Sequence, residues 1–486
     1  MRHVLKISFY VLIALFVFIS CNKDRVIPNS SRPANPVNPV APVNKPPVAN
    51  AGPDISVSYD LQNCRIDPVE LDGRSSTDQD GRIISFFWQG PGLISRPDSA
   101  NITVRPLSTG QHQFVLSVAD DKGGSGRDTV IVNVVSRMNR PIINAQLIPI
   151  GTLSQPRGGI AVGFAGSKIV FAGAASYSGQ TNPSTRVDIY DINTNSWSMA
   201  ELRVARQDFA VVTSGNKIFF AGGWEGNWWD FPIMFTNVDI YDVVTNLWSV
   251  KHLSEPRAWI GAASAGSKVF FAGGTGGPDN NWQASSKVDI YDTETDSWTT
   301  SVLSEPRSNI STQIAGDKIY FAGGATQPSW TPQATVDVYD INNGLWSVSS
   351  MSEPKSHMKS YATGAKIIWA GGSTYAINYW GTYTSGTVEI KDVTTQGSTF
   401  SCLLEAKSWW DNNQKAVLKN NQVVFFTGDG VANKFDIYDI VNNSWSIGEL
   451  NENIAGAAVI SVNNTIYVAG GYVNGSLSNI VWKLEF

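Results

Sequence analysis

The chain has 486 residues, 42% of them hydrophobic, and a formal net charge of −5 at pH 7. This is ample apolar material for a core, and the length fits two domains better than one. The negative charge argues against a nucleic-acid partner, so we expect none.

The first twenty residues, 1–20, are predicted to be a signal peptide, because basic residues precede an apolar run (7–19) that is too short to span a bilayer. The run ends at Phe18-Ile19-Ser20-Cys21, which resembles the lipobox of bacterial (Bacteroidetes-like) lipoproteins, with phenylalanine where leucine is commonest. The resemblance implies cleavage before Cys21, lipidation of Cys21 and attachment to a membrane. The alternative is an ordinary secretory signal followed by a chance cysteine.

Residues 21–45 are rich in proline and are predicted to be an extended tether. Asn22 follows the cysteine, where some lipoproteins carry an aspartate that holds them in an inner membrane. We therefore expect a lipid-anchored protein of the cell envelope, in the outer membrane.

A first β-domain is predicted over residues 46–135, where strand-like runs alternate with polar turns. The runs 71–81, Phe86-Phe87-Trp88 and 114–123 resemble, in this order, a PKD domain, an immunoglobulin-like β-sandwich common in bacterial surface proteins. The resemblance implies a spacer role.

Acidic loops of this domain could hold calcium through Asp78, Asp80 and Asp120, because calcium prefers hard carboxylate oxygens. The alternative is that these aspartates form Asx turns, which Asp and Gly favour in any case. No other cofactor is expected.

The rest of the chain repeats one unit about every 50 residues. Each unit has a strand of small residues, a tight turn, an apolar strand and a glycine step. A strand such as Val288-Asp289-Ile290-Tyr291-Asp292 and a strand bearing a tryptophan then follow. The glycine steps are Ala172-Gly173-Ala174, Ala221-Gly222-Gly223, Ala272-Gly273-Gly274, Ala322-Gly323-Gly324, Ala370-Gly371-Gly372, Thr427-Gly428-Asp429 and Ala469-Gly470-Gly471.

Seven such units in tandem resemble the kelch repeat family. The resemblance implies an all-β fold, a seven-bladed kelch-type β-propeller over residues 136–486, preceded by the immunoglobulin-like (PKD) β-sandwich. The seventh unit ends after three strands, so we expect the run 142–150 to supply its fourth strand and close the ring.

Two sets of loop residues on one face of the propeller are the candidate ligand-binding residues. The loops between second and third strands carry aromatic residues, and the loops between blades carry cations. These residues are Trp224, Trp228, Trp229, Trp282, Trp330, Tyr379, Trp380, Arg157, Arg206, Arg257, Arg307 and Lys355. The bland alternatives are that the tryptophans pack on their own loops and that each cation bridges neighbouring blades.

The aromatic and cationic face predicts recognition of a glycan or a protein ligand, without catalysis. A second hypothesis is a sugar-acting enzyme, because sialic acid epimerases or mutarotases also use kelch propellers. Its acid–base groups would come from Glu353, Lys355, His357 and Lys359. A third is a structural scaffold of an envelope complex. With one cysteine in each part of the chain (Cys21, Cys64 and Cys402), we expect no disulfide framework.

Overall fold

The computed structural model describes residues 43–58, 64, 68–91, 93–105, 110–135, 140–173, 183–227, 230–276, 283–377, 381–403, 416–426 and 433–486. The expected signal peptide, Cys21 and most of the expected tether lie outside these residues. Within them, no helix is long and apolar enough to cross a membrane.

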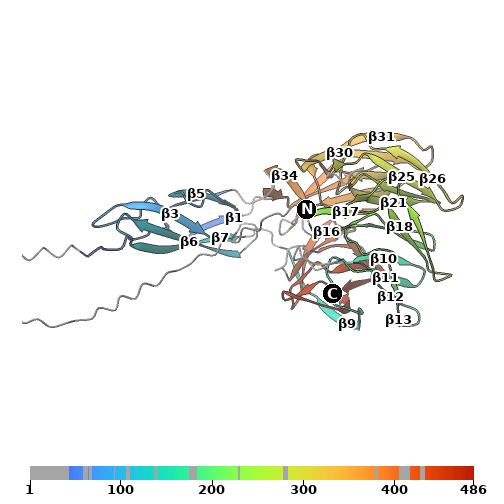
Figure 1. The fold of residues 1–486 in the computed structure, drawn as a ribbon, viewed down its shortest axis with the longest axis horizontal. Coiled ribbons are helices and arrows are strands. Elements are labelled where there is room, and N and C mark those ends of the chain that lie inside the picture. The colour runs from blue at the N-terminus through green and yellow to red at the C-terminus, as the bar shows by residue number, and fades with distance from the viewer. Residues whose placement is uncertain are drawn as a thin grey trace, which may run out of the picture. The chain divides into compact units, whose positions relative to one another are not determined.

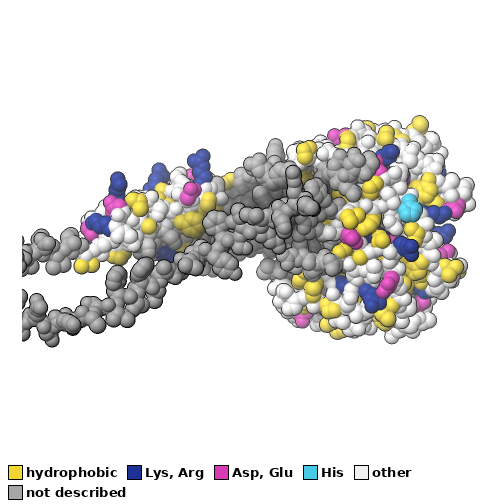
Figure 2. All heavy atoms as spheres, viewed as in Figure 1, with side chains coloured by type: hydrophobic (Ala, Val, Ile, Leu, Met, Phe, Trp, Pro, Cys, Tyr) yellow, Lys and Arg dark blue, Asp and Glu magenta, His cyan; other side chains and the backbone are white. Residues whose placement is uncertain are grey.

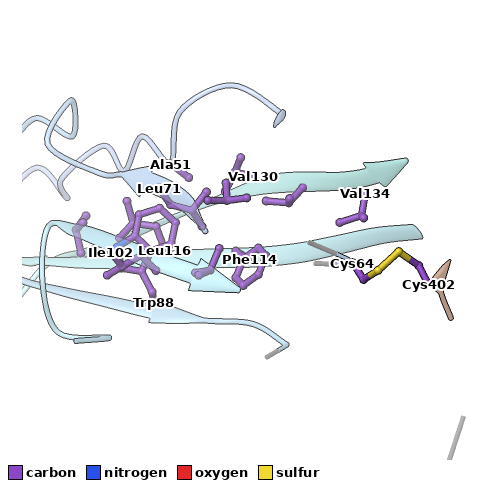
Figure 3. Close-up of a cluster of buried hydrophobic side chains, with 14 residues drawn as sticks. Ala51, Cys64, Leu71, Trp88, Ile102, Phe114, Leu116, Val130, Val134 and Cys402 are labelled. Carbon is purple, nitrogen blue, oxygen red and sulfur yellow. A yellow bond between two sulfur atoms is a disulfide. The ribbon is translucent and has the colours of Figure 1, made fainter. Parts of the chain in front are cut away.

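The first domain is a two-sheet β-sandwich. Its strands, in sheet order, are β1 (Ile55–Ser58), β7 (Ser125–Val135), β6 (Gly110–Asp120) and β3 (Ile83–Gln89) in one sheet, and β2 (Val69–Asp72), β5 (Asn101–Arg105) and β4 (Leu93–Ser95) in the other. Alternate residues of β7 point inward, so Val130, Val132 and Val134 pack with Trp88 and Phe114 (Figure 3). This alternation is what one buried face requires.

The second domain, whose strands are labelled in part in Figure 1, is a propeller of seven blades, each built on four antiparallel strands. The strands of each blade are given from the innermost outward, and those of the first three blades are: blade 1, β10 (Ala161–Ala165), β11 (Lys168–Ala172), β12 (Arg186–Asp191) and β13 (Ser196–Glu201); blade 2, β14 (Ala210–Ser214), β15 (Lys217–Ala221), β18 (Asn237–Asp242) and β19 (Leu247–His252); blade 3, β21 (Gly261–Ala265), β22 (Lys268–Ala272), β25 (Lys287–Asp292) and β26 (Ser297–Val302). The next two blades are: blade 4, β27 (Ser311–Ala315), β28 (Lys318–Ala322), β30 (Thr331–Asp340) and β31 (Trp346–Lys355); blade 5, β32 (Lys359–Thr363), β33 (Lys366–Ala370), β36 (Thr387–Asp392) and β37 (Ser398–Cys402). The last two blades are: blade 6, β38 (Val417–Lys419), β39 (Gln422–Phe426), β40 (Lys434–Asp439) and β41 (Ser444–Glu449); blade 7, β43 (Ala458–Val462), β44 (Thr465–Ala469), β47 (Ile480–Glu485) and β9 (Gln146–Thr152).

The ring closes through β9, which pairs antiparallel with β47 and so gives the last blade its outer strand from the start of the domain. The closing strand covers a shorter stretch than the expected 142–150. Its first residues form a separate strand, β8 (Ile142–Asn144), which pairs in parallel with β41 of blade 6. The expectation was wrong for these residues, because the chain crosses from one blade to the next around Ala145.

Neighbouring blades pack through large side chains of the second and third strands. In blade 3, Phe271 of β22 is fully buried and packs in one cluster with Phe219 of blade 2. Tyr291 lies 4.9 Å from Trp298 of the same blade, measured between ring centroids, and both residues belong to this cluster with Phe219 of blade 2. The strand tryptophans therefore belong to the packing between blades.

Candidate functional site

The five loop cations that were expected to face a ligand are buried. Their relative exposures are between 0 and 3%, and the residues are Arg157, Arg206, Arg257, Arg307 and Lys355. In blades 1 to 4 each arginine forms an ion pair with the aspartate of the third strand of its own blade: Asp188, Asp239, Asp289 and Asp337. These side chains therefore form no exposed cationic ring. Each arginine is a buried structural cation, as the alternative proposed, but its carboxylate partner lies in its own blade and not in a neighbouring one.

Blade 3 shows how such an arginine acts. Nη1 of Arg257 donates to the carbonyl oxygens of Gly273 (2.5 Å) and Lys287 (2.9 Å), and Nη2 contacts the carboxylate of Asp289. Burial lowers the pKa of Arg257, and the carboxylate of Asp289 opposes this shift. An arginine stays charged in any protein environment, so the pair fixes the loop against the glycine step.

In Figure 2, Lys and Arg side chains on the visible face of the propeller are interspersed with Asp and Glu, with no broad basic area.

A set of equivalent residues lies two positions after these cations, or after Ile454 at the same position of blade 7. All have a positive φ, between 52° and 63°, and together we call them the loop ring: Gly159, Asp208, Trp259, Asn309, His357 and Gly456. Backbone hydrogen bonds join ring members of adjacent blades, from Gly159 N to Gly456 O (2.9 Å), from Trp259 N to Asp208 O (3.1 Å) and from Asn309 N to Trp259 O (3.1 Å). Among the described residues these bonds thus link blade 7 to blade 1 and blade 2 through blade 3 to blade 4, just before the innermost strands.

Positive φ costs a residue other than glycine about 1–2 kcal/mol, and two members of the ring are indeed glycine. Asp208, Trp259, Asn309 and His357 adopt the same backbone without that freedom. Such strain concentrates at functional sites, where the surrounding structure imposes it. This pattern makes the loop ring the first candidate for a binding site.

Three tryptophans meet beside the loop ring. Trp224, at the start of β16 (Trp224–Asn227), is buried, and its Nε1 donates to the carboxylate of Asp208 (2.7 Å). The ring of Trp259 lies 5.8 Å from that of Trp224 and 6.2 Å from that of Trp330, to which it is nearly perpendicular. Trp259 and Trp330 are each half-buried, so they can present aromatic surface. We call these three residues the tryptophan cluster.

The structure thus changes the expectation for the loop aromatics. Trp224 is a buried anchor for Trp259 and offers no surface to a ligand, because it packs with Met234 and Ala258. Trp330 remains a candidate. The other expected contacts lie outside the described residues: Trp228, Trp229, Trp282, Tyr379 and Trp380.

Sequence reasoning missed Asp208, Trp259 and Asn309. The available signal was the alignment of the units, since all three occupy a position where Gly159 and Gly456 stand in other blades. Alignment of the units would have shown that these three residues replace a glycine, and such a replacement indicates a constrained backbone position.

The side chains of the enzyme hypothesis do not form one acid–base site. Glu353 is paired with buried Lys355 (3.0 Å), and it also accepts a hydrogen bond from Ser385. His357 instead contacts Ser356, with 3.2 Å between Nδ1 and Oγ, and burial lowers its pKa to about 4. His357 is therefore neutral near pH 7, and Lys355 is held in a structural pair.

The expected calcium ligands of the sandwich are engaged by protein groups. Asp80 accepts a hydrogen bond from Nζ of Lys122 (3.1 Å), and Asp120 accepts the backbone N–H groups of Lys122 (2.9 Å) and Gly124 (2.7 Å). Asp78 accepts from the backbone N–H of Asp80 (3.2 Å). No group of three or more His, Cys, Asp or Glu side chains in the described part of the chain could hold a metal ion. The contacts of Asp78 and Asp120 with the N–H group two residues further on are those of Asx turns. Asp80 instead forms an ion pair with Lys122.

A cavity of about 300 Å³ lies between the innermost strands of blades 5, 6 and 7. Its lining is mostly apolar and includes Tyr361, Leu418 and Ile460. The polar groups at its edge already have partners, because Asn464 is bonded to Asn420 and Ser461 to the carbonyl of Leu418. It therefore lacks the convergent polar groups of a typical ligand site.

Cys64 and Cys402 form a disulfide, with their Cα atoms 5.3 Å apart (Figure 3). Cys64 belongs to the first domain, and Cys402 is the last residue of β37 in blade 5. The expectation of no disulfide framework was wrong for this pair. It treated residues of different domains as distant, whereas folding brings two positions 338 residues apart together.

Comparisons with known proteins agree with this architecture. A family model for PKD domains, of the kind found in the KIAA0319-like proteins, matches residues 51–134, and the Kelch motif model matches residues 256–301 and 454–485. The chain thus carries an N-terminal PKD domain followed by a kelch-repeat propeller.

Curated relatives resemble parts of the chain. The Dyslexia-associated protein KIAA0319-like protein of Mus musculus is 35% identical over 103 residues, which is 20% of this chain and 9% of that protein. The human Dyslexia-associated protein KIAA0319 is 36% identical over 103 residues, with the same coverage. An F-box/kelch-repeat protein of Arabidopsis thaliana is 31% identical over 113 residues, 22% of this chain and 28% of its own length. Each match spans less than a third of the relative.

Among solved structures, "Structure of YjhT" has a TM-score of 0.43 and 15% sequence identity. The match covers 68% of this chain and 95% of that one.

Proposed function

From a kelch propeller that follows a PKD domain, we propose a lipid-anchored binding protein of the cell envelope. In this proposal the propeller recognises a glycan or protein ligand at its loop face, and the PKD domain acts as a spacer. Cys21 anchors the chain to the outer membrane, and the protein has no catalytic activity.

The tryptophan cluster carries the proposal. Trp259 and Trp330 lie half-buried on loops of adjacent blades, and the buried ring of Trp224 packs against Trp259. A sugar ring or an apolar side chain gains most from rigid aromatic surfaces of this kind, because little side-chain freedom is lost on binding. Asp208, which is half-buried, lies next to Trp259 in the loop ring and would add a polar contact that orients the ligand.

The cell-envelope location is supported by the sequence around Cys21 and by the disulfide. Disulfides persist in oxidising compartments and are rare where glutathione keeps thiols reduced. A pairing of Cys64 with Cys402 is therefore consistent with an exported protein.

The binding proposal is tested on glycan and surface-protein arrays with the full chain and two variants, Trp259→Gly and Trp330→Gly. Glycine suits both positions, where φ is +52°, and in two other blades it stands at the ring position equivalent to Trp259. The matched control is Phe400→Ala, which removes an exposed aromatic side chain from the outer strand of blade 5.

We expect binding to be lost in both tryptophan variants and kept in the control, with similar melting temperatures. Binding that survives in both tryptophan variants would move the site away from the cluster. An absence of binding by the unmodified chain, with turnover of a sugar, would favour the enzyme hypothesis. An absence of both would favour the scaffold.

A further inference from the structure

Blade 6 is completed by a residue from outside the repeats. Arg140 lies between the two domains, and its Nη1 donates to Oδ1 of Asp436 (2.8 Å) in β40. The two side chains are 10% and 0% exposed. Nη2 of Arg140 donates to the carbonyl oxygen of Cys402, and the guanidinium carbon lies 4.7 Å from the ring centroid of Trp445. Arg140 thus contacts both blade 5 and blade 6.

Asp436 occupies the position held by Asp289 in blade 3. In blades 1 to 5 one oxygen of this carboxylate accepts a backbone N–H from the preceding loop, donated by Ser154, Arg203, Ser254, Ser304 or Ser352. In blade 6 Oδ1 of Asp436 accepts from Arg140. In blade 6 this carboxylate is therefore contacted by a guanidinium from the segment that joins the two domains.

Blade 7 of the same chain has apolar residues in place of this ion pair. The positions of the cation and the carboxylate hold Ile454 and Trp482, which pack in one apolar cluster. A blade can thus be built without this ion pair. The retention of Asp436 in blade 6 goes with the presence of a cation, because a buried carboxylate without a partner would be strongly unfavourable.

The residues that follow Arg140 extend blade 6 by one strand. β8 pairs in parallel with β41, with Ile142 opposite Ile447 and Asn144 opposite Glu449. Further backbone hydrogen bonds at either end join Ile447 N to Pro141 O (2.9 Å) and Ala145 N to Glu449 O (2.8 Å). An outer strand that would otherwise expose its backbone groups is thereby covered.

The disulfide joins the first domain to Cys402, beside the Arg140 contacts. Cys402, whose carbonyl accepts from Arg140, is the residue bonded to Cys64. Its side chain is buried in a cluster with residues of the sandwich, including Val134 (Figure 3). Three features thus converge on the junction of blades 5 and 6: the Arg140 contacts, β8 and the disulfide.

We propose that the junction of blades 5 and 6 is the docking site for the chain's own N-terminal module, held by Arg140 and β8 and locked by the Cys64–Cys402 disulfide. The PKD domain is then joined to the propeller at two points, the peptide chain and the disulfide. The inference is independent of any ligand at the loop face.

The covalent part is tested on the full chain produced in an oxidising compartment. After digestion without reductant, mass spectrometry should find a peptide that links Cys64 to Cys402, and reduction should separate it. If both thiols can be alkylated before any reduction, the proposed disulfide between Cys64 and Cys402 is contradicted. Cys402→Ser should lower the melting temperature to that of the reduced unmodified protein, because each treatment removes the same cross-link.

The noncovalent part is tested by hydrogen exchange on Arg140→Gln. We expect amides of β40, β41 and β8 to exchange at least about tenfold faster, since the variant loses the buried ion pair between Arg140 and Asp436. Strands β12 and β13 should be unchanged. Asp436→Asn provides a second variant, which removes the charge and keeps the shape.

The matched control is Arg186→Gln, which breaks an exposed ion pair with Glu201 in blade 1. Exchange in blade 6 should stay as in the unmodified protein, because exposed pairs contribute little. An unchanged exchange rate in blade 6 of Arg140→Gln would overturn the docking role.

Discussion

Arg257 and Asp289 form an ion pair inside blade 3, where their side chains are 0% and 2% exposed. The second oxygen of Asp289 accepts the backbone N–H of Ser254 at 3.2 Å. The pair thus connects the third strand of the blade to the loop that enters it. Because the same pair recurs in blades 1, 2 and 4, it is a structural unit of the propeller.

Replacement of one partner should destabilise the propeller. We expect Arg257→Leu to lower the free energy of unfolding by about 3–5 kcal/mol, because Asp289 would remain charged and buried. Denaturant unfolding of the full chain measures this loss. The control Arg186→Leu, in an exposed pair, should cost at most about 1 kcal/mol.

Replacement of both partners should be less harmful than the two single changes together. The double variant Arg257→Ile with Asp289→Trp reproduces the residues of blade 7, Ile454 and Trp482. We expect a favourable coupling of about 1–3 kcal/mol between the two changes in a double-mutant cycle. Strictly additive losses would show that the pair is not one unit.

The first glycine of the glycine step should resist substitution. Gly273 has a φ of +64°, and a Cβ there would overlap the carbonyl oxygen of Arg307. We expect Gly273→Ala to cost more than about 3 kcal/mol, from strain and overlap together. Gly266→Ala is the matched control, because its φ is +58° with no atom within 4 Å of the added Cβ. It should cost about 1–2 kcal/mol in the same unfolding assay, and equal losses would contradict the overlap.

Stability should depend on pH through His357. Its pKa falls from 6.5 to about 4 on folding because of burial, so the unfolded chain binds more protons between these values. The contribution is fully present above pH 6.5 and is lost as the pH falls toward 4, by at most about 3 kcal/mol. Unfolding should be measured at several pH values in this window.

His357→Asn should flatten this dependence, since Asn309 already holds the equivalent ring position at a φ of +54°. The variant His252→Asn, which replaces an exposed histidine, is the control and should keep the profile of the unmodified protein. A profile that is identical in all three proteins would exclude His357 as the source.

Calcium should not stabilise the sandwich. The ammonium of Lys122 already faces Asp80, at 3.1 Å, and Asp120 is occupied by two backbone N–H groups. We expect the melting temperature of the sandwich to be the same in EDTA and in about 1 mM calcium, a concentration at which weak extracellular sites are filled. A rise with calcium that Asp80→Asn abolishes would contradict this.

Much of the fold could be predicted from the sequence because the propeller is built by repetition. The spacing of the glycine steps and of the strand tryptophans predicted seven blades, and seven are found. The missing fourth strand of the last unit predicted that the start of the domain would close the ring, and β9 does so. Both inferences depend on local patterns that every unit shares.

The candidate site was predicted less well. Arg257 is buried because it pairs with Asp289, which is distant in sequence. The local sequence around Arg257 is the same whether its side chain is exposed or buried in an ion pair, so it could not distinguish the two cases. The loop ring was missed because its members differ in type and share only a backbone conformation. Trp330 is the expected contact that remains a described candidate.

The sequence by itself determined the architecture: a PKD domain followed by a seven-bladed propeller. Strand periodicity, turn residues and glycine steps are local properties that each unit repeats. Only the tertiary structure decided which charges are buried and which cysteines meet. Arg257 with Asp289, Arg140 with Asp436, and Cys64 with Cys402 are pairs that the folded chain brings together, and no local pattern records such distances.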